Sequence, residues 1–139
     1  MSTIAANLGG RAAIAERSSP SYQAYQILHL SFTVAPVVAG IDKFFHLLGN
    51  WDQYLAPWVA SLSPVSGHTL MLATGVIEAS AGILVAVRPR LGAPIVGAWL
   101  CLIIINLATM GAYFDVALRD LGLALAAFAL WRLAQEFGR

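Results

Sequence analysis

The chain has 139 residues, of which 59% are hydrophobic and 11% are charged, and its mean hydropathy is +0.74. An average globular domain carries about 25% charged residues, so this composition excludes a soluble globular protein. The formal net charge of +1 provides no long-range field that would attract DNA or RNA. The sequence has one cysteine, Cys101, which excludes an intramolecular disulfide and a redox pair of thiols. We therefore expect a one-domain integral membrane protein.

The first 18 residues are expected to form a cytoplasmic arm ahead of the membrane domain. Their apolar residues are too scattered for the hydrophobic region of a cleaved signal peptide. Residues 19–139 then form the transmembrane domain, because a helix needs about 20 mostly apolar residues to cross a hydrocarbon layer of about 30 Å. The first span is expected at about 25–48, with Ser19 as a helix cap and Pro20 in the first turn.

Three further spans are expected at about 66–87, 91–112 and 113–133. The sequence Arg88-Pro89-Arg90 ends the second span, since charge and proline together stop a membrane helix. The turn between the third and fourth spans is also very short, and short turns make consecutive helices antiparallel neighbours. The sequence thus predicts an all-α fold, an integral membrane bundle of four helices that run up and down.

The positions of lysine and arginine predict the orientation, because basic residues remain on the cytoplasmic side. With the N-terminus inside, the basic residues outside the helix interiors all fall inside: Arg11, Arg17, Arg88, Arg90, Arg132 and Arg139. Both termini are therefore expected in the cytoplasm. The outer connection, residues 49–65, has no basic residue and carries Trp51, Tyr54 and Trp58, which we expect as interfacial aromatics at the headgroup level.

Several polar side chains lie within the predicted spans, where a charge costs at least about 2.5 kcal/mol unless it finds a partner or water. They all fall in the outer half of the bundle, and we expect most of them to face one interior as a structural or ligand-binding cluster. These residues are Asp42, Lys43, His46, Glu78, Asn106, Arg119 and Asp120.

Glu78 lies near the middle of its span, on a helix face that also carries Thr74, Gly75 and Gly82. Small residues let a neighbouring helix approach closely, so this face is expected to point inward. Two roles stay open for Glu78. Paired with Lys43 or Arg119 it is a structural lock, the reading that we favour because buried charges are normally paired; unpaired, it is a candidate for proton handling.

The histidines do not favour a haem, although His46 and His68 both fall near the outer membrane surface. An interfacial position in contact with water explains His68 without a ligand. No metal site is expected either, since no HxxH, ExxH or HExxH spacing places ligands on one helix face. Cys101 is expected to be an inert small hydrophobe, and Trp99 to pack against lipid or a neighbouring helix.

Three short motifs, by their order along the chain and their positions in the predicted spans, resemble the DoxX-like family of small four-helix bacterial membrane proteins, of the DoxX, DoxD and MauE types. They are Gly40-Ile-Asp-Lys43-Phe, Glu78-Ala-Ser-Ala-Gly82-Ile-Leu and Arg119-Asp120-Leu-Gly-Leu-Ala, within about residues 37–133. The resemblance implies a bacterial inner-membrane subunit that accompanies oxidoreductases acting on the quinone pool, with Lys43, Glu78 and Asp120 as its key positions. MauE-type relatives are tied to disulfide chemistry, which the lone Cys101 argues against here.

Two main functions follow as hypotheses. The first is a non-catalytic subunit that packs against other membrane subunits of a larger respiratory or photosynthetic electron-transfer complex, with no firmly bound cofactor. The second is a small oxidoreductase in which Lys43, Glu78 and Asp120 bind a quinone headgroup or a similar lipophilic substrate. A transporter ranks last, because the cytoplasmic half offers few polar groups for a path through the bundle.

Overall fold

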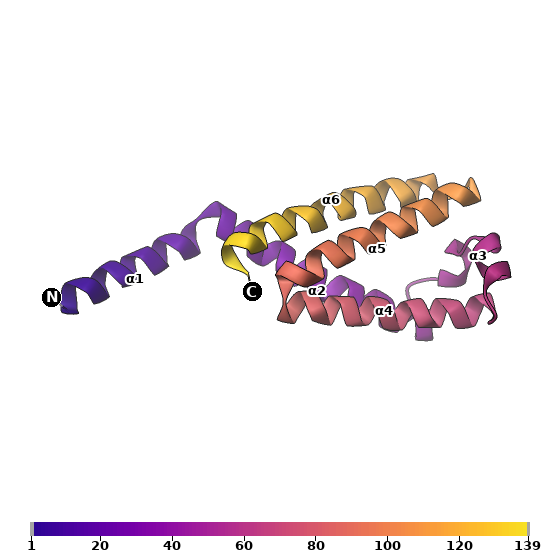
Figure 1. Cartoon of the computed structure of the whole chain (residues 1–139), viewed down its shortest axis with the longest axis horizontal. Coiled ribbons are helices and arrows are strands. Elements are labelled where there is room, and N and C mark those ends of the chain that lie inside the picture. The colour runs from indigo at the N-terminus through magenta and orange to yellow at the C-terminus, as the bar shows by residue number, and fades with distance from the viewer. Residues whose placement is uncertain (1, 139) are drawn as a thin grey trace.

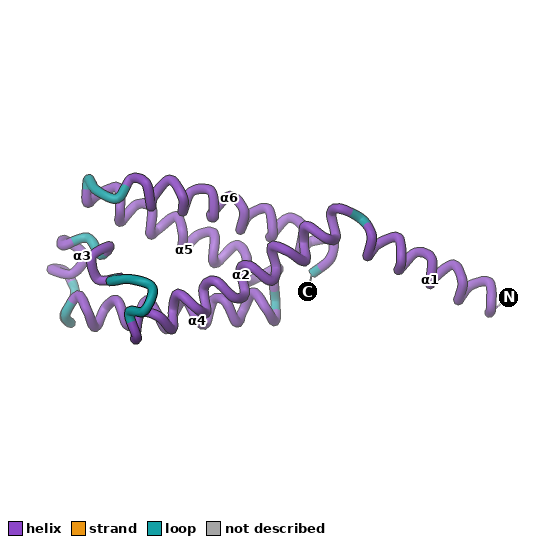
Figure 2. Tube along the Cα trace, turned by 180° about the vertical axis from the view of Figure 1, so that it is seen from behind, coloured by secondary structure: helices purple, strands orange, loops and turns teal. Residues whose placement is uncertain are grey.

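The computed structural model describes residues 2–138, and this part of the chain is helical with short connections and no strands (Figure 1). The longest helices lie side by side, while the helix at the N-terminus extends away from them (Figures 1 and 2). The elements in chain order are α1 (Ser2–Ser18), α2 (Pro20–Phe45), the 3-10 helix η1 (Trp51–Tyr54), α3 (Pro57–Leu62), α4 (Gly67–Val87), α5 (Pro89–Met110) and α6 (Phe114–Phe137). The predicted all-α class is confirmed.

Helices α2, α4 and α5 are long and apolar enough to cross a membrane. They correspond to the first three predicted spans, and they are compatible with a multi-pass membrane protein. Helix α6 has 24 residues, which is also long enough, but charged residues lie in both of its end regions. Three of the four predicted spans are therefore helices that could cross a membrane by their length and composition.

The helix boundaries follow the capping signals more closely than the hydropathy. Helix α2 begins at Pro20, where the Ser19 side chain accepts a hydrogen bond from the Tyr22 amide, five residues before the predicted start of the span. It ends at Phe45, three residues earlier than predicted, because His46 adopts a left-handed conformation with φ 56°. Helix α5 ends at Met110, because the next residue, Gly111, is also left-handed with φ 67°.

Consecutive long helices pack as neighbours: α2 against α4, α4 against α5, and α5 against α6, with α6 also touching α2. Arg88 alone links α4 to α5, and a turn of three residues links α5 to α6. The predicted antiparallel hairpins are thus present (Figure 2). The N-terminal arm, helix α1, and the C-terminus lie at one end of these helices, which we call the arm end, and α3 lies at the opposite, connection end (Figure 1).

Helix α2 packs very closely on α4 because glycines line the contact. A Cβ atom added at Gly75 would lie 2.6 Å from the Gly40 carbonyl oxygen, and one added at Gly82 would lie 2.8 Å from the Thr33 carbonyl oxygen. Any larger side chain at Gly75 or Gly82 would push the two backbones apart. Both glycines are buried, as the sequence predicted for the Glu78 face of this helix.

Helix α2 is displaced along α4 towards the arm end. Lys43 packs on Gly75, yet α2 stops two residues after Lys43 while α4 continues for eight residues to Gly67. At 1.5 Å per residue, α2 falls short of the connection end by roughly 9 Å. The segment that joins α2 to α4, residues 46–66, occupies this end of the molecule, with η1 and α3 inside it (Figure 1).

Candidate functional site

A buried ion pair joins α2 to α4 near the middle of α4. Lys43 Nζ lies 2.5 Å from Glu78 Oε2, and the two side chains are 5% and 11% exposed. The other carboxylate oxygen, Glu78 Oε1, accepts a hydrogen bond of 3.1 Å from Trp99 Nε1 of α5. Both oxygens of the carboxylate therefore have a partner, and three helices meet at one acidic side chain.

Trp99 was expected to pack against lipid or a neighbouring helix, and its part in this site was not foreseen. A signal for it does exist in the sequence. Glu78 lies ten residues before Arg88, and Trp99 lies ten residues after Pro89. Positions equally far from the turn of an antiparallel helical hairpin lie at the same height, so the Arg88-Pro89 turn itself brings these two residues level.

The ammonium group of Lys43 also faces an aromatic ring from the connection. Lys43 Nζ lies 4.1 Å from the centroid of the Trp51 ring, a distance at which the ring's negative face attracts a cation. The indole N–H of Trp51 points elsewhere and donates a hydrogen bond of 2.7 Å to Asp42 Oδ2. Trp51, expected only as an interfacial aromatic, thus contacts two of the predicted polar residues.

Asp42 is buried, but it serves the end of α2 and not the ion pair. Its two oxygens accept hydrogen bonds from the backbone amides of Leu47 at 2.9 Å and Leu48 at 3.0 Å. These amides belong to irregular backbone just beyond the helix, where no helical carbonyl is available to them. Asp42 therefore supplies the hydrogen bonds that the early end of α2 leaves unmade.

Asn106 has the same task on the opposite side of the connection. Its side-chain oxygen accepts from the Ala56 amide at 2.9 Å, and its side-chain nitrogen donates to the Tyr54 carbonyl at 2.6 Å. Ala56 is fully buried, so its amide depends on this partner. Nearby, Trp58 Nε1 donates to Thr109 Oγ1 at 2.9 Å, and the Tyr54 ring packs on Tyr113.

Asp120 is buried on α6 and interacts electrostatically with both Lys43 and Glu78. Its carboxylate lies 3.9 Å from Nε of the adjacent Arg119. The side chain of Arg119 is 67% exposed, so it points away from the interior. Asp120 thus belongs with the Lys43–Glu78 pair, whereas Arg119 lies on the outside.

His46 lies beyond the ion pair, where it faces His68. The two imidazole rings are stacked with their centroids 5.7 Å apart. His68 Nδ1 in turn lies 2.8 Å from Asp52 Oδ2 of η1. No metal-binding spacing was expected along any one helix, but here three separate segments bring two imidazoles and a carboxylate together.

The seven residues expected in one cluster therefore occupy different places. Lys43 and Glu78 form the buried pair, and Asp120 is buried on α6, where its charge attracts Lys43 and repels Glu78. Asp42 and Asn106 hold the connection, His46 meets His68, and Arg119 is exposed. Of the seven residues, only Lys43, Glu78 and Asp120 thus share the interior that the sequence predicted. The structure adds Trp51 and Trp99 to them.

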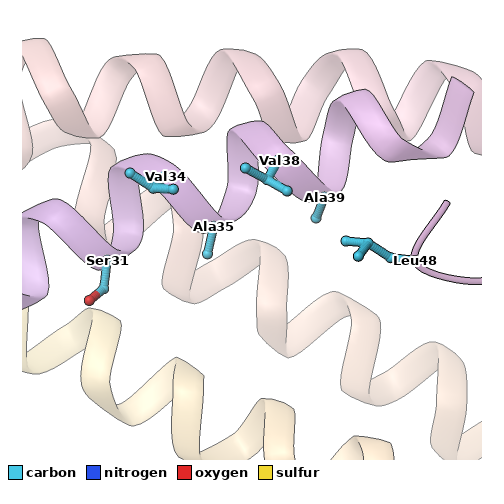
Figure 3. Close-up of a pocket in the computed structure, with 6 residues that line it drawn as sticks. All are labelled: Ser31, Val34, Ala35, Val38, Ala39 and Leu48. Carbon is cyan, nitrogen blue, oxygen red and sulfur yellow. The ribbon is translucent and has the colours of Figure 1, made fainter. Parts of the chain in front are cut away.

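An open apolar groove of about 450 Å³ runs along α2. Helix α2 contributes most of its lining, and the residue at its far end comes from just beyond that helix (Figure 3). The lining consists of Ser31, Val34, Ala35, Val38, Ala39 and Leu48. None of the charged residues of the ion pair lines this groove.

Comparison with protein-family models, with curated proteins and with solved structures finds no match to this chain.

Proposed function

We propose that this chain is a non-catalytic membrane subunit of the DoxX-like type, which packs within a larger electron-transfer complex of a bacterial inner membrane. The observation that carries this proposal is the Lys43–Glu78–Trp99 arrangement. Each group in it already has a partner within the chain, so the arrangement acts as a lock between α2, α4 and α5. A catalytic carboxylate would instead present an oxygen or a proton to a substrate.

The outward faces of the long helices support the membrane setting. Large apolar side chains are exposed along each of them, as expected for surfaces that meet lipid or the helices of another subunit. They include Ile27 and Leu30 of α2, Ile77 and Ile83 of α4, Leu102 and Ile105 of α5, and Leu118 and Leu125 of α6. On this proposal α6 is the fourth span, with Asp120 facing inward and Arg119 near the membrane surface.

Because α2 stops short of the connection end, the irregular backbone there needs polar side chains if it lies within a membrane. Irregular backbone at membrane depth is tolerated only where its N–H and C=O groups find partners inside the protein. Asp42 and Asn106 provide such partners for four backbone groups between Leu47 and Ala56. Their polarity is thus accounted for without a substrate.

The central test is purification of the tagged protein from its native membrane in mild detergent. We expect electron-transfer subunits to co-purify in fixed stoichiometry, measured by mass spectrometry of the associated chains. Glu78→Gln should lower the yield of the assembly, because it weakens the lock, while Arg119→Gln at an exposed position should not. A protein that purifies alone, with an intact fold, would contradict the proposal.

The second candidate, a quinone- or lipid-binding oxidoreductase, is favoured by the apolar groove along α2. Solvent extraction of the same preparation would then release a quinone. Ala35→Trp should fill the groove and remove this quinone, whereas Gly122→Trp, at an exposed position with no atoms near an added Cβ, should keep it. Equal quinone content in both variants would dismiss the groove as the binding place.

The proposed orientation has its own test. Arg88, Arg90 and Arg132 lie towards the arm end, which would face the cytoplasm by the positive-inside rule. In a Cys101→Ala background, a cysteine at the exposed Asn50 should react with an impermeant maleimide in intact cells, while one at the exposed Glu136 should react only after lysis. The reverse pattern would invert the topology.

A further inference from the structure

Three potential metal ligands meet at the connection end from three separate segments of the chain. His46 directly follows α2, Asp52 belongs to η1, and His68 lies in the first turn of α4. One donor atom from each of them lies within 4.8 Å of the other two. The sequence separation of these residues hides the grouping, which depends on how the connection folds back over α4.

One oxygen of Asp52 has no partner within the described part of the chain. Asp52 Oδ2 is occupied by His68 Nδ1, but Oδ1 is buried and accepts no hydrogen bond from residues 2–138. A buried carboxylate oxygen without a partner is costly, and a bound cation is one of the ways in which proteins satisfy it. This oxygen is a second observation, independent of the histidines, that points to a ligand.

The surrounding backbone fixes Asp52 in its place. Its amide donates to the Asn50 side chain at 3.3 Å, and its carbonyl accepts from the Leu55 amide at 3.3 Å. The hydrogen bond from the adjacent Trp51 to Asp42 ties the connection back to α2. The backbone of Asp52 is therefore held by hydrogen bonds that leave its carboxylate free to bind a ligand.

We propose that His46, Asp52 and His68 bind a divalent transition-metal ion, for which Zn²⁺ is the best match. Two imidazole nitrogens and one carboxylate oxygen are ligands that Zn²⁺ accepts, and three protein ligands leave a fourth position for water. Mg²⁺ prefers an all-oxygen octahedral shell and does not suit this set. The side chain of His68 is 54% exposed, so the ion can enter from the aqueous phase.

Binding must rearrange the three groups. Tetrahedral Zn²⁺ with bonds of about 2.0–2.1 Å places its ligand atoms about 3.3 Å from one another. The three donor atoms now lie within 4.8 Å of one another, and His68 Nδ1 and Asp52 Oδ2 are only 2.8 Å apart, so this pair has to separate slightly to admit the ion. Rotation of the exposed His68 ring and of the Asp52 carboxylate, which now bond to each other, can supply this movement. The bound ion would then link the end of α2, η1 and α4, whatever complex the chain belongs to.

The test uses the full chain in detergent, stripped of metal and titrated with Zn²⁺, Co²⁺ and Mg²⁺. We expect one Zn²⁺ per chain by calorimetry, visible absorption bands of four-coordinate Co²⁺, a rise in melting temperature with Zn²⁺, and no response to Mg²⁺. His46→Asn, Asp52→Asn and His68→Gln should each weaken Zn²⁺ binding at least tenfold. Asparagine is chosen at position 46 because it tolerates the left-handed backbone there.

The matched controls are His29→Gln and Asp115→Asn. His29 lies at the arm end against the Val85 carbonyl, and Asp115 is exposed at the start of α6. Both variants should bind Zn²⁺ as tightly as the parent chain does. The Co²⁺ spectrum of the parent chain tests the site even if a ligand variant fails to fold. The proposal is overturned if no stoichiometric Zn²⁺ binds, if the three ligand variants bind like the controls, or if the protein as purified shows a haem spectrum that His46→Asn removes.

Discussion

Helix α2 is displaced along α4 towards the arm end, and there aromatic rings pack around it. At the connection end α2 stops short of the end of α4, and polar side chains hold the backbone that follows it. Tyr22 and Tyr25 pack on Phe137 with ring centroids 5.2 Å and 5.8 Å away. Asp42 and Asn106, in contrast, hold irregular backbone through hydrogen bonds. A single displacement of one helix thus requires apolar contacts at one end and buried polar groups at the other.

The ion pair lies between these two ends, and its removal should have the largest effect. Lys43→Met leaves Glu78 charged and buried without its partner, and we expect a loss of about 3–5 kcal/mol in the free energy of unfolding. The double variant Lys43→Met/Glu78→Met should recover most of this loss, because apolar side chains of similar size can replace a buried pair. Unfolding in detergent, followed by circular dichroism, measures both.

The exposed Arg119 provides the control for the ion pair. Arg119→Met should change stability by less than about 0.5 kcal/mol, the usual range for exposed positions. If the double variant is as unstable as Lys43→Met alone, the ion pair stabilises the fold more than two apolar side chains can. The contact between the helices would then require the charges themselves. If Lys43→Met is as stable as the parent chain, the lock does not exist.

The sequence was sufficient for the helices but not for their relative height. Hydropathy and caps located α4 to within a residue, because both of its ends carry local signals at Ser66 and at Arg88-Pro89. The offset of α2 depends instead on where Gly40 meets Gly75, a contact between residues 35 positions apart. No local pattern encodes that register, so the early end of α2 could not be expected.

The same reason explains which part of the site was foreseen. Lys43 and Glu78 were candidates because a charge inside an apolar span needs a partner wherever it lies. Asp42 and His46 were placed in the same interior, since a longer α2 would have carried both of them there, and Asn106 was placed there because it lies in the outer half of the third span. The shorter helix turns Asp42 to backbone amides and leaves His46 beside His68.

At the connection end, Asn106→Ala should loosen the contact between α5 and the segment before α3. It leaves the buried Ala56 amide without its acceptor, which costs about 2 kcal/mol. Hydrogen exchange should accelerate at residues 54–58 and remain slow at the arm end. Gln53→Ala, at an exposed position in η1, should leave the exchange unchanged. Uniform acceleration along the chain would mean that Asn106 supports the whole fold.

At the arm end the corresponding change should have the smallest effect. Arg90 Nε and Nη2 donate to the carbonyl oxygens of Ala134 and Gln135, both at 2.9 Å, and so satisfy the end of α6. Arg90 is exposed, so water can replace its hydrogen bonds, and Arg90→Gln should cost about 1 kcal/mol. Hydrogen exchange should report fraying of the last turn of α6 only. Arg88→Gln, exposed in the same turn, is the matched control. If Arg90→Gln lowers the free energy of unfolding as much as Asn106→Ala does, the arm end also depends on polar contacts. The packing of Tyr22 and Tyr25 on Phe137 would then not suffice to hold α6.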